Sequence, residues 1–248
     1  MKLSAIVLTK NEEINISGCL RGLSFCDEVI VIDDNTTDGT IKIAEYLGAK
    51  VCKRNLNEDF ANQRNFGLDI ARNNWVLFVD ADERITEKLK KEIISLLKED
   101  NGFNGFYIPR KDSIWGKTLT YGETAKIKLL RLGKKNAGRW KRKVHEYWEI
   151  QGKIGELKNH LLHYPHQNLT EFLDHINKYS TVHAKENLKE AKKSTIIKIL
   201  LYPIIKFIRN YFIKSGFIDK EAGLNVSLMM SLHSFLAWSK LWILQKNE

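Results

Sequence analysis

The chain has 248 residues, of which 43% are hydrophobic and 28% are charged, so it can bury a sizeable core as one large domain or as a core with an appendage. Its three cysteines, Cys19, Cys26 and Cys52, are odd in number and lack zinc-ligand spacing, which argues against a disulfide framework and favours a reducing compartment. The net charge of +10 arises in the C-terminal part, since residues 1–110 carry 15 basic and 18 acidic side chains and residues 111–248 carry 25 and 12.

Strand-like and helix-like patterns alternate through the first hundred residues. Short apolar runs rich in β-branched and aromatic residues predict buried strands, and amphipathic stretches between them predict helices. We expect strands at 3–8, 28–32, 49–53 and 75–79, with helices at about 14–23, 40–47 and 60–71. This β-α-β-α-β-α-β order predicts an α/β fold with a parallel, doubly wound sheet and helices on both faces.

Polar side chains follow the predicted strands at the points where the strands end. Thr9 and Asn11 follow the first strand, Asp34 follows the second, and Asp80 and Asp82 follow the fourth. In an open α/β sheet, ligands bind outside the carboxyl ends of the strands. We therefore expect these side chains to converge on one ligand site.

Asp80 and Asp82 are the strongest candidates for a cation site. Side chains two positions apart on an extended segment project the same way, and two close carboxylates repel each other unless a positive group lies between them. Mg²⁺ or Mn²⁺, held by carboxylates and substrate phosphates, would meet that need. A structural alternative makes Asp80 a strand-end turn residue and Asp82 the N-cap of a helix over 86–97.

The sequence contains no glycine-rich phosphate cradle. Neither a Gly-x-Gly-x-x-Gly after the first strand nor a Gly-x-x-x-x-Gly-Lys-Ser/Thr is present, which argues against dinucleotide-dependent oxidoreductases and P-loop enzymes. Phosphates would have to be held by the metal and by arginine or lysine side chains.

Four segments in this order resemble the family 2 glycosyltransferases. They are IVLTKNEE at 6–13, VIDDNTTDGT at 31–40, NQRN at 62–65 and FVDAD at 78–82. The resemblance covers residues 1 to about 100. It implies a GT-A fold that binds a nucleoside diphosphate sugar, most often a UDP-sugar, together with a divalent cation.

The resemblance also implies roles for individual residues around the nucleotide. Thr9, Asn11 and Glu12 would line the nucleotide pocket, and Asp34 would reach the base. Arg64 would lie near the uracil or the diphosphate. Asp80 would contact the ribose or the metal, and Asp82 would be the main ligand of Mg²⁺ or Mn²⁺.

Residues 101–165 would then form the acceptor half of a catalytic domain spanning 1–165. An inverting transfer needs a base to take the proton of the acceptor hydroxyl, and Glu146 is the candidate, with His145 as its orienting neighbour or as a second choice. Val-His-Glu at 144–146 resembles the equivalent segment of a lipopolysaccharide core glycosyltransferase subgroup. The structural alternative is a surface strand in which Glu146 pairs with a nearby lysine.

Three histidines recur at every third position before the C-terminal region: His160, His163 and His166. Their spacing matches no zinc pattern, and Pro165 prevents them from sharing a helix face. We interpret them as structural, with His163 placed near the acceptor.

Residues 166–248 predict a basic and apolar helical extension with helices over 170–192, 196–213 and 222–244. Basic residues and a proline interrupt the second helix, which argues against a membrane-spanning segment and favours a helix lying in the membrane interface. A helix packed on the catalytic domain is the alternative. We expect peripheral membrane contact through 196–244.

The resulting hypothesis is an inverting transfer of sugar from a nucleoside diphosphate sugar to a cell-envelope glycolipid or oligosaccharide. The chain enters a strand directly after Lys2 without a signal peptide pattern, so we expect a cytoplasmic protein at the inner face of the cell membrane. Two alternatives are a basic nucleic-acid-binding module that uses Lys141, Arg142 and Lys143, and a sugar-phosphate nucleotidyltransferase. Acidic strand ends and the missing phosphate loop count against them, so we expect no nucleic acid partner.

Overall fold

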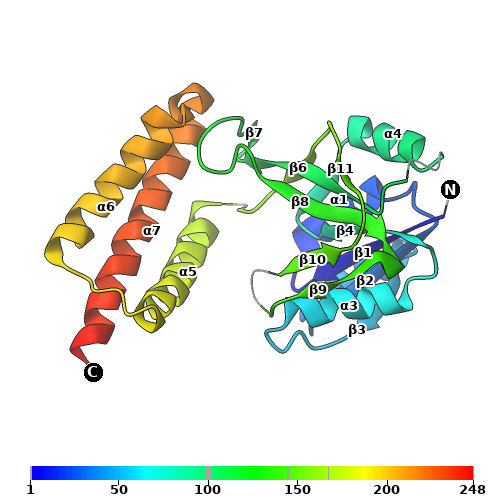
Figure 1. Cartoon of the computed structure of the whole chain (residues 1–248), viewed down its shortest axis with the longest axis horizontal. Helices are drawn as coiled ribbons and strands as arrows, with labels where there is room; N and C mark the ends of the chain where they lie inside the picture. The colour runs from blue at the N-terminus through cyan, green and yellow to red at the C-terminus, as the bar shows by residue number, and fades with distance from the viewer. Residues whose placement is uncertain (1, 99–101, 144–145, 167, 248) are drawn as a thin grey trace. The chain divides into compact units, whose positions relative to one another are not determined.

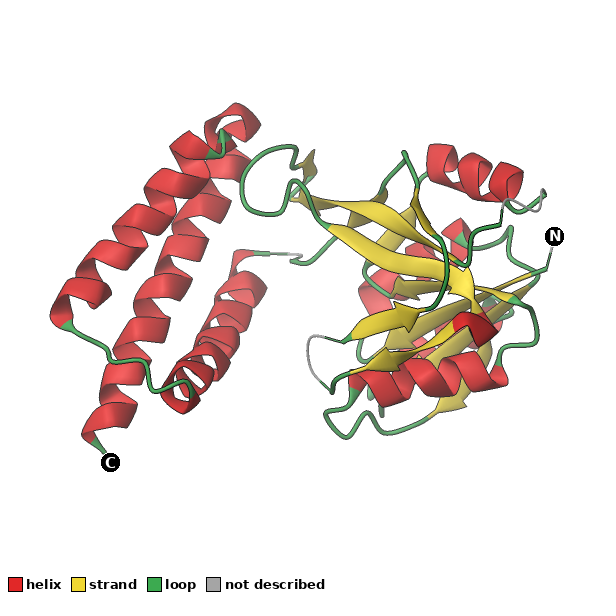
Figure 2. Ribbon diagram, viewed as in Figure 1, coloured by secondary structure: helices red, strands yellow, loops and turns green. Residues whose placement is uncertain are grey.

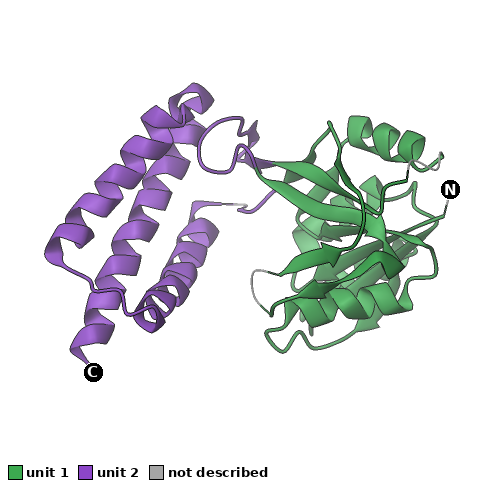
Figure 3. Ribbon diagram, in the orientation of Figure 1, with its two compact units in different colours: residues 1–110, 127–163 green, residues 111–126, 164–248 purple. Residues whose placement is uncertain are grey.

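A computed structural model describes residues 2–98, 102–143, 146–166 and 168–247 of the chain (Figure 1). The chain divides into two compact units, one formed by residues 1–110 and 127–163 and the other by residues 111–126 and 164–248 (Figure 3). Residues 111–126 thus group with the C-terminal helices, although the sequence analysis counted them in the acceptor half.

Four parallel strands form the N-terminal half of the sheet in the first unit. They run in the order β3 (Lys50–Lys53), β2 (Glu28–Asp33), β1 (Leu3–Thr9) and β4 (Trp75–Asp80). Thr9 pairs with Asp33, and Leu8 pairs with Asp80, so the polar strand ends lie at one edge of the sheet. The predicted α/β fold and the convergence of these strand ends are confirmed.

Helices connect these strands close to the predicted positions: α1 (Glu13–Gly22), α2 (Thr40–Tyr46), α3 (Phe60–Ile70) and α4 (Glu87–Leu96). The N-cap of α4 is Thr86, whose hydroxyl accepts a hydrogen bond from Leu89 N at 3.2 Å, so the alternative role of Asp82 as the cap is wrong.

The second half of the sheet is mixed. Strand β8 (Lys128–Lys134) pairs antiparallel with β4, and β6 (Gly105–Ile114) pairs antiparallel with β8. Short strands complete this part of the fold: β5 (Glu83–Ile85), β7 (Lys117–Thr118), β11 (Ile154–Glu156) and β12 (Leu161–His163). Because β12 pairs with β5 and β8 pairs with β4, residues distant in sequence are brought to the segment that follows β4.

A hairpin of β9 (Gly138–Lys141) and β10 (Tyr147–Ile150) follows the 3-10 turn η1 (Lys135–Ala137) (Figure 2). A cluster of aromatic rings holds this hairpin against the sheet. Trp140 and Trp148 stack with ring centroids 5.6 Å apart, and both meet Phe78 of β4 edge-on, at 5.1 and 5.2 Å. All three rings are buried, so their packing adds stability to that which the backbone hydrogen bonds give the hairpin. Glu146 directly precedes β10 and is thereby fixed beside α3.

The second unit is helical. It contains α5 (Leu169–Lys189), α6 (Ile196–Ile208) and α7 (Lys220–Lys246), with a π turn η2 (Arg209–Ile213) and a 3-10 turn η3 (Gly216–Asp219) between the last two helices. Phe172 and Ile176 of α5 pack on Met229 of α7. Within the described residues, no helix combines the length and the apolarity needed to cross a bilayer.

Candidate active site

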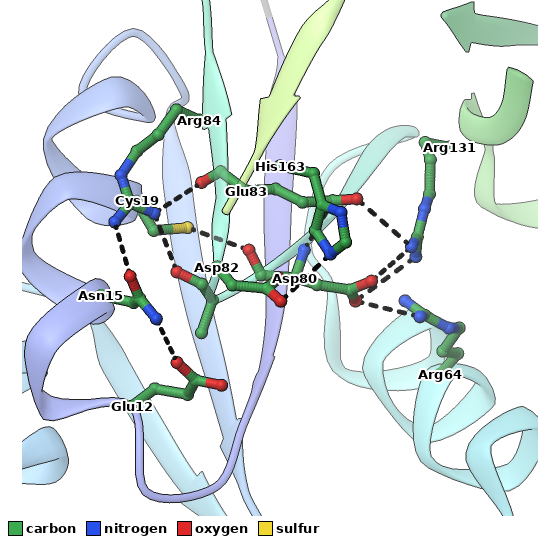
Figure 4. Close-up of polar contacts among 11 residues, drawn as sticks. Glu12, Asn15, Cys19, Arg64, Asp80, Asp82, Glu83, Arg84, Arg131 and His163 are labelled. Carbon is green, nitrogen blue, oxygen red and sulfur yellow. Dashed lines mark hydrogen bonds and ion pairs between the residues drawn. The ribbon is translucent and has the colours of Figure 1, made fainter. Parts of the chain in front are cut away.

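Asp80 lies at the centre of a network of charged side chains at the carboxyl end of β4 (Figure 4). Its Oδ1 accepts a hydrogen bond from Nη2 of Arg64 at 3.0 Å, and its Oδ2 accepts one from Nη2 of Arg131. Burial by itself would raise the pKa of Asp80, but the charges and hydrogen bonds of Arg131 and Arg64 outweigh it and hold that pKa well below its usual range. Both carboxylate oxygens of Asp80 are therefore engaged by guanidinium groups.

Arg64 of α3 joins Asp80 to the candidate base. Its Nε donates to Oε1 of Glu146 at 3.0 Å while its Nη2 donates to Asp80, and its guanidinium carbon lies 4.8 Å from the ring centroid of Trp140. The third nitrogen, Nη1, is buried and has no hydrogen-bond partner within the part of the chain that the structure describes. The alternative in which Glu146 pairs with Lys141 or Lys143 is wrong, because its partner is Arg64.

Arg131 and Glu83 complete the network, and the sequence analysis assigned a role to neither. Glu83 is fully buried; its Oε2 accepts a hydrogen bond from Asp80 N at 2.9 Å, and its Oε1 lies 3.8 Å from Nη2 of Arg131. Burial raises the pKa of Glu83, although the charge of Arg131 opposes this. The only sequence signal for Glu83 was its place directly after Asp82, and Arg131 was one residue of a predicted strand.

Asp82 has different surroundings from Asp80. One of its oxygens, Oδ2, lies 3.2 Å from Nε2 of His163, which is at the end of β12. The side chain of Asp82 is 25% exposed and that of His163 is 15% exposed. The pairing of β5 with β12 thus places the His163 imidazole next to Asp82.

The segment between β4 and β5 is anchored to helix α1 (Figure 4). Nη1 of Arg84 donates to the carbonyl oxygens of Ala81 and Glu83 at 2.9 and 3.0 Å, and its Nη2 donates to Oδ1 of Asn15 at 3.3 Å. Nδ2 of Asn15 in turn donates to Oε2 of Glu12 at 2.8 Å. Glu12, predicted to line the nucleotide pocket, is placed by the structure in this anchor.

The ends of β1 and β2 contribute further polar groups to this edge of the sheet. Asp34 accepts hydrogen bonds from Nζ of Lys10 and from Leu56 N, at 2.8 and 2.9 Å. Burial would raise the pKa of Asp34, but these bonds and the charge of Lys10 lower it. Oγ1 of Thr9 is buried and has no hydrogen-bond partner among the described residues.

Asn11 adopts a left-handed backbone conformation with φ of 54°, which asparagine tolerates better than most residues. Asn11 does not cap α1, because the N-cap position is Glu12, and among the described residues no side chain caps the helix. Oδ1 of Asn11 instead accepts a hydrogen bond from Thr37 N at 2.8 Å. Asn11 therefore fastens the loop after β1 to the loop after β2.

The described residues offer an incomplete metal site. Among residues 2–98, 102–143, 146–166 and 168–247, no three His, Cys, Asp or Glu side chains gather closely enough to hold a metal ion by themselves. Asp82 and His163 could supply one carboxylate and one imidazole, and substrate phosphates commonly complete such a coordination shell. Asp80 fits this role less well because two arginines hold its oxygens. His145, the second candidate for the base, lies outside the described residues.

Comparisons with known proteins bear on the family of the chain. A protein-family model described as Glycosyl transferase family 2 matches residues 4–150. Over 256 residues the chain is 28% identical to the lipopolysaccharide core biosynthesis glycosyltransferase LpsC of Rhizobium meliloti (strain 1021), which covers 98% of this chain and 92% of that protein. The residues of the network around Asp80, from Arg64 to Glu146, lie within the range that the family model matches.

Two solved structures are also similar to the chain. The crystal structure of S. aureus TarS 1–349 is 17% identical with a TM-score of 0.48, covering 100% of this chain and 92% of that one. Glucosyl-3-phosphoglycerate synthase from Mycobacterium tuberculosis, solved with Mn²⁺, uridine diphosphate and glucosyl-3-phosphoglycerate, is 22% identical with a TM-score of 0.37, covering 46% and 44%. The mostly parallel first half of the sheet and the family match both agree with the GT-A fold that the sequence resemblance implied.

Proposed function

Since the chain belongs to glycosyl transferase family 2, and is therefore a glycosyltransferase, we propose that it transfers a sugar, with inversion, from a nucleoside diphosphate sugar to a cell-envelope glycolipid or oligosaccharide. A UDP-sugar is the proposed donor. The observation that carries the proposal is the double contact of Arg64, which holds Glu146 and Asp80 at the same edge of the sheet. Family membership favours this activity over a nucleic-acid-binding module or a nucleotidyltransferase.

The nucleotide would occupy the edge formed by the ends of β1, β2 and β4. Asp34 and the loop of Thr9, Asn11 and Glu12 would surround the base and ribose, in line with their convergence at this edge. Thr9 has a buried hydroxyl to which none of the described residues is hydrogen-bonded, which suits a contact to the nucleoside. The hydrogen bond that Asn11 accepts from Thr37 N would keep the loops after β1 and β2 rigid.

Asp82 and His163 would hold Mg²⁺ or Mn²⁺ beside the diphosphate, with Asp80 in a supporting position. When bound, such a cation stabilises the negative charge that develops on the departing diphosphate. Arg64 and Arg131 keep Asp80 ionised, and their guanidinium groups are also paired with Glu146 and Glu83. We therefore assign Asp80 to the ribose and to the orientation of the arginines rather than to direct coordination.

Glu146 would act as the general base. Arg64 binds its Oε1, which leaves Oε2 for the acceptor hydroxyl. The hydroxyl proton passes to Glu146 as the acceptor oxygen bonds to the anomeric carbon, and the bond from that carbon to the diphosphate breaks with its electron pair moving to the diphosphate. Arg64 thus positions both the base and the carboxylate on the donor side.

The test is a donor screen that measures nucleoside diphosphate release by the purified chain with and without Mn²⁺ or Mg²⁺. We expect metal-dependent release, which Asp82→Ala and Glu146→Gln each reduce by at least about a hundredfold. Glu149→Gln is the matched control, because Glu149 lies on the same hairpin and its Oε2 lies 3.8 Å from Nζ of the exposed Lys141. Unchanged activity in Asp82→Ala would refute the metal role, and unchanged activity in Glu146→Gln would refute its role as the base.

A further inference from the structure

Helix α6 turns its apolar side to solvent. Six aliphatic side chains, each between 44% and 63% exposed, recur along one side of the helix and form what we call the outer α6 face: Ile197, Leu200, Leu201, Ile204, Ile205 and Ile208. A surface helix of a globular protein normally directs such a stripe into the core. No residue of α6 is buried, so the outer α6 face is unusual in both composition and orientation.

Polar contacts on the opposite side of α6 fix this orientation within the second unit. Nζ of Lys206 donates to Oε1 of Glu123 at 2.6 Å, and the buried Asn210 just beyond the helix donates to Oε2 of the same carboxylate at 3.1 Å. Oγ of Ser231 on α7 donates to the carbonyl oxygen of Pro203 at 2.8 Å. Rotating the helix to bury its aliphatic side would break these bonds and leave the Glu123 carboxylate without these two hydrogen-bond donors. The exposed face is therefore a stable property of the unit.

The charge of the surrounding segment is uniform. Residues 191–218 contain no acidic side chain, and their six basic residues are Lys192, Lys193, Lys198, Lys206, Arg209 and Lys214. A second copy of this chain would bring two such segments together and place like charges side by side, while nucleic acid would leave the aliphatic stripe in water. An anionic lipid surface satisfies both properties, because acyl chains receive the aliphatic stripe and headgroups receive the basic side chains other than Lys192 and Lys206, which pair with Glu190 and Glu123.

We propose that the outer α6 face is a membrane-docking surface that lies in the plane of an anionic bilayer. The helix has 13 residues and is therefore roughly 20 Å long, which is too short to cross a hydrocarbon core of about 30 Å. Helix α7 instead forms the packing centre of the unit, since it packs against both α5 and α6 and buries Met229, Ala237 and Leu241. This narrows the membrane contact expected for 196–244 to α6.

Vesicle binding by the full chain tests the proposal without depending on the proposed sugar transfer, because it needs no donor or acceptor. The probes are vesicles of phosphatidylcholine alone and vesicles that also contain phosphatidylglycerol, assayed by co-sedimentation. We expect binding to the anionic vesicles that weakens with added salt. The variant Ile197→Gln/Leu201→Gln/Ile204→Gln should weaken it by at least about a hundredfold.

Two further variants test the basic side chains beside the outer α6 face and the neighbouring helix α7. Arg209→Gln, at an exposed basic position next to the face, should weaken binding to anionic vesicles about fivefold and leave weak binding to neutral vesicles unchanged. The matched control is Leu228→Gln/Ile243→Gln, which changes two exposed aliphatic residues of α7 and should bind like the original chain.

Four results would overturn the proposal, the first three of which concern the outer α6 face itself. These three are the absence of binding to anionic vesicles, equal binding by the triple α6 variant when circular dichroism shows it folded, and a lipid-free dimer that the triple variant dissociates. The third result, seen by analytical ultracentrifugation, would assign the face to a second copy of the chain. The fourth, loss of binding in the α7 control alone, would place the membrane contact on α7 instead.

Discussion

Replacing Arg64 by methionine tests the network around Asp80 most directly. Methionine keeps an unbranched, flexible side chain but removes the guanidinium, with its contact to the Trp140 ring and its two hydrogen bonds, each 3.0 Å long, to Glu146 and Asp80. Arg64 is a buried residue, whereas the side chains of Glu146 and Asp80 are 18% and 30% exposed. The substitution therefore removes a largely desolvated guanidinium whose two carboxylate partners are only partly hydrated.

The magnitude follows from these contacts. Breaking a buried ion pair by removing one partner costs about 3–5 kcal/mol, and we expect Arg64→Met to lie near about 3 kcal/mol because Asp80 keeps Arg131 and remains partly hydrated. Arg64→Lys should recover only part of this, since one ammonium group cannot reproduce the two directed bonds of the guanidinium. Both variants should also lose transfer activity, because the position of Glu146 relaxes.

Urea unfolding of the original chain, Arg64→Met, Glu146→Gln and the double variant forms a thermodynamic cycle for this pair. Since Arg64 donates a charge-assisted hydrogen bond to Glu146, we expect a coupling free energy of about 1.5–3 kcal/mol. A destabilisation by Arg64→Met of less than about 0.5 kcal/mol, the size typical of surface substitutions, would refute the assignment of Arg64 as the buried link of the site. A coupling near zero would refute the Arg64–Glu146 contact.

Three further predictions concern other parts of the chain. His163→Gln should weaken Mn²⁺ binding in the presence of UDP by at least about tenfold in calorimetric titration while leaving the unfolding midpoint nearly unchanged, and an unaltered affinity would remove His163 from the metal site. Gly223→Ala should destabilise the second unit by about 2 kcal/mol or more, measured by thermal unfolding, because a Cβ there would lie 1.9 Å from the carbonyl oxygen of Gly216. Burial and nearby positive charges lower the pKa of both His183 and His233, whose stacked rings have centroids 5.6 Å apart. Because the unfolded chain then binds protons more readily than the folded chain, stability should fall as the pH drops below the ordinary histidine pKa of 6.5. His233→Gln should flatten that pH dependence. An identical pH profile in the variant would contradict this origin of the acid sensitivity.

The sequence was sufficient to predict the nucleotide half of the fold. Strands β1 to β4 and helices α1 to α3 lie within one or two residues of their predicted bounds, because apolar periodicity and polar strand ends are local patterns. The edge at which Thr9, Asp34 and Asp80 meet also followed from the sequence, since parallel strands bring their carboxyl ends to the same side. Family membership was likewise indicated by motifs that each lie within a few residues.

Only the tertiary structure decided which side chains partner which. The spacing of Asp80 and Asp82 suggested one shared cation, yet two arginines hold Asp80, whereas His163 lies beside Asp82. Arg131 is 51 residues from Asp80, and Glu146 is 82 residues from Arg64, so no local pattern could reveal these pairs. They depend on the antiparallel pairing of β8 with β4 and on the aromatic packing of the β9–β10 hairpin.

The same division holds for helix α6. Its sequence specified an amphipathic helix with one aliphatic side, because that property depends only on the spacing of residues along the chain. Whether that side faces the protein or the solvent was decided by Lys206 and Asn210, which bind Glu123, a residue more than eighty positions away. Periodicity determines which residues share a face, and long-range contacts determine where the face points.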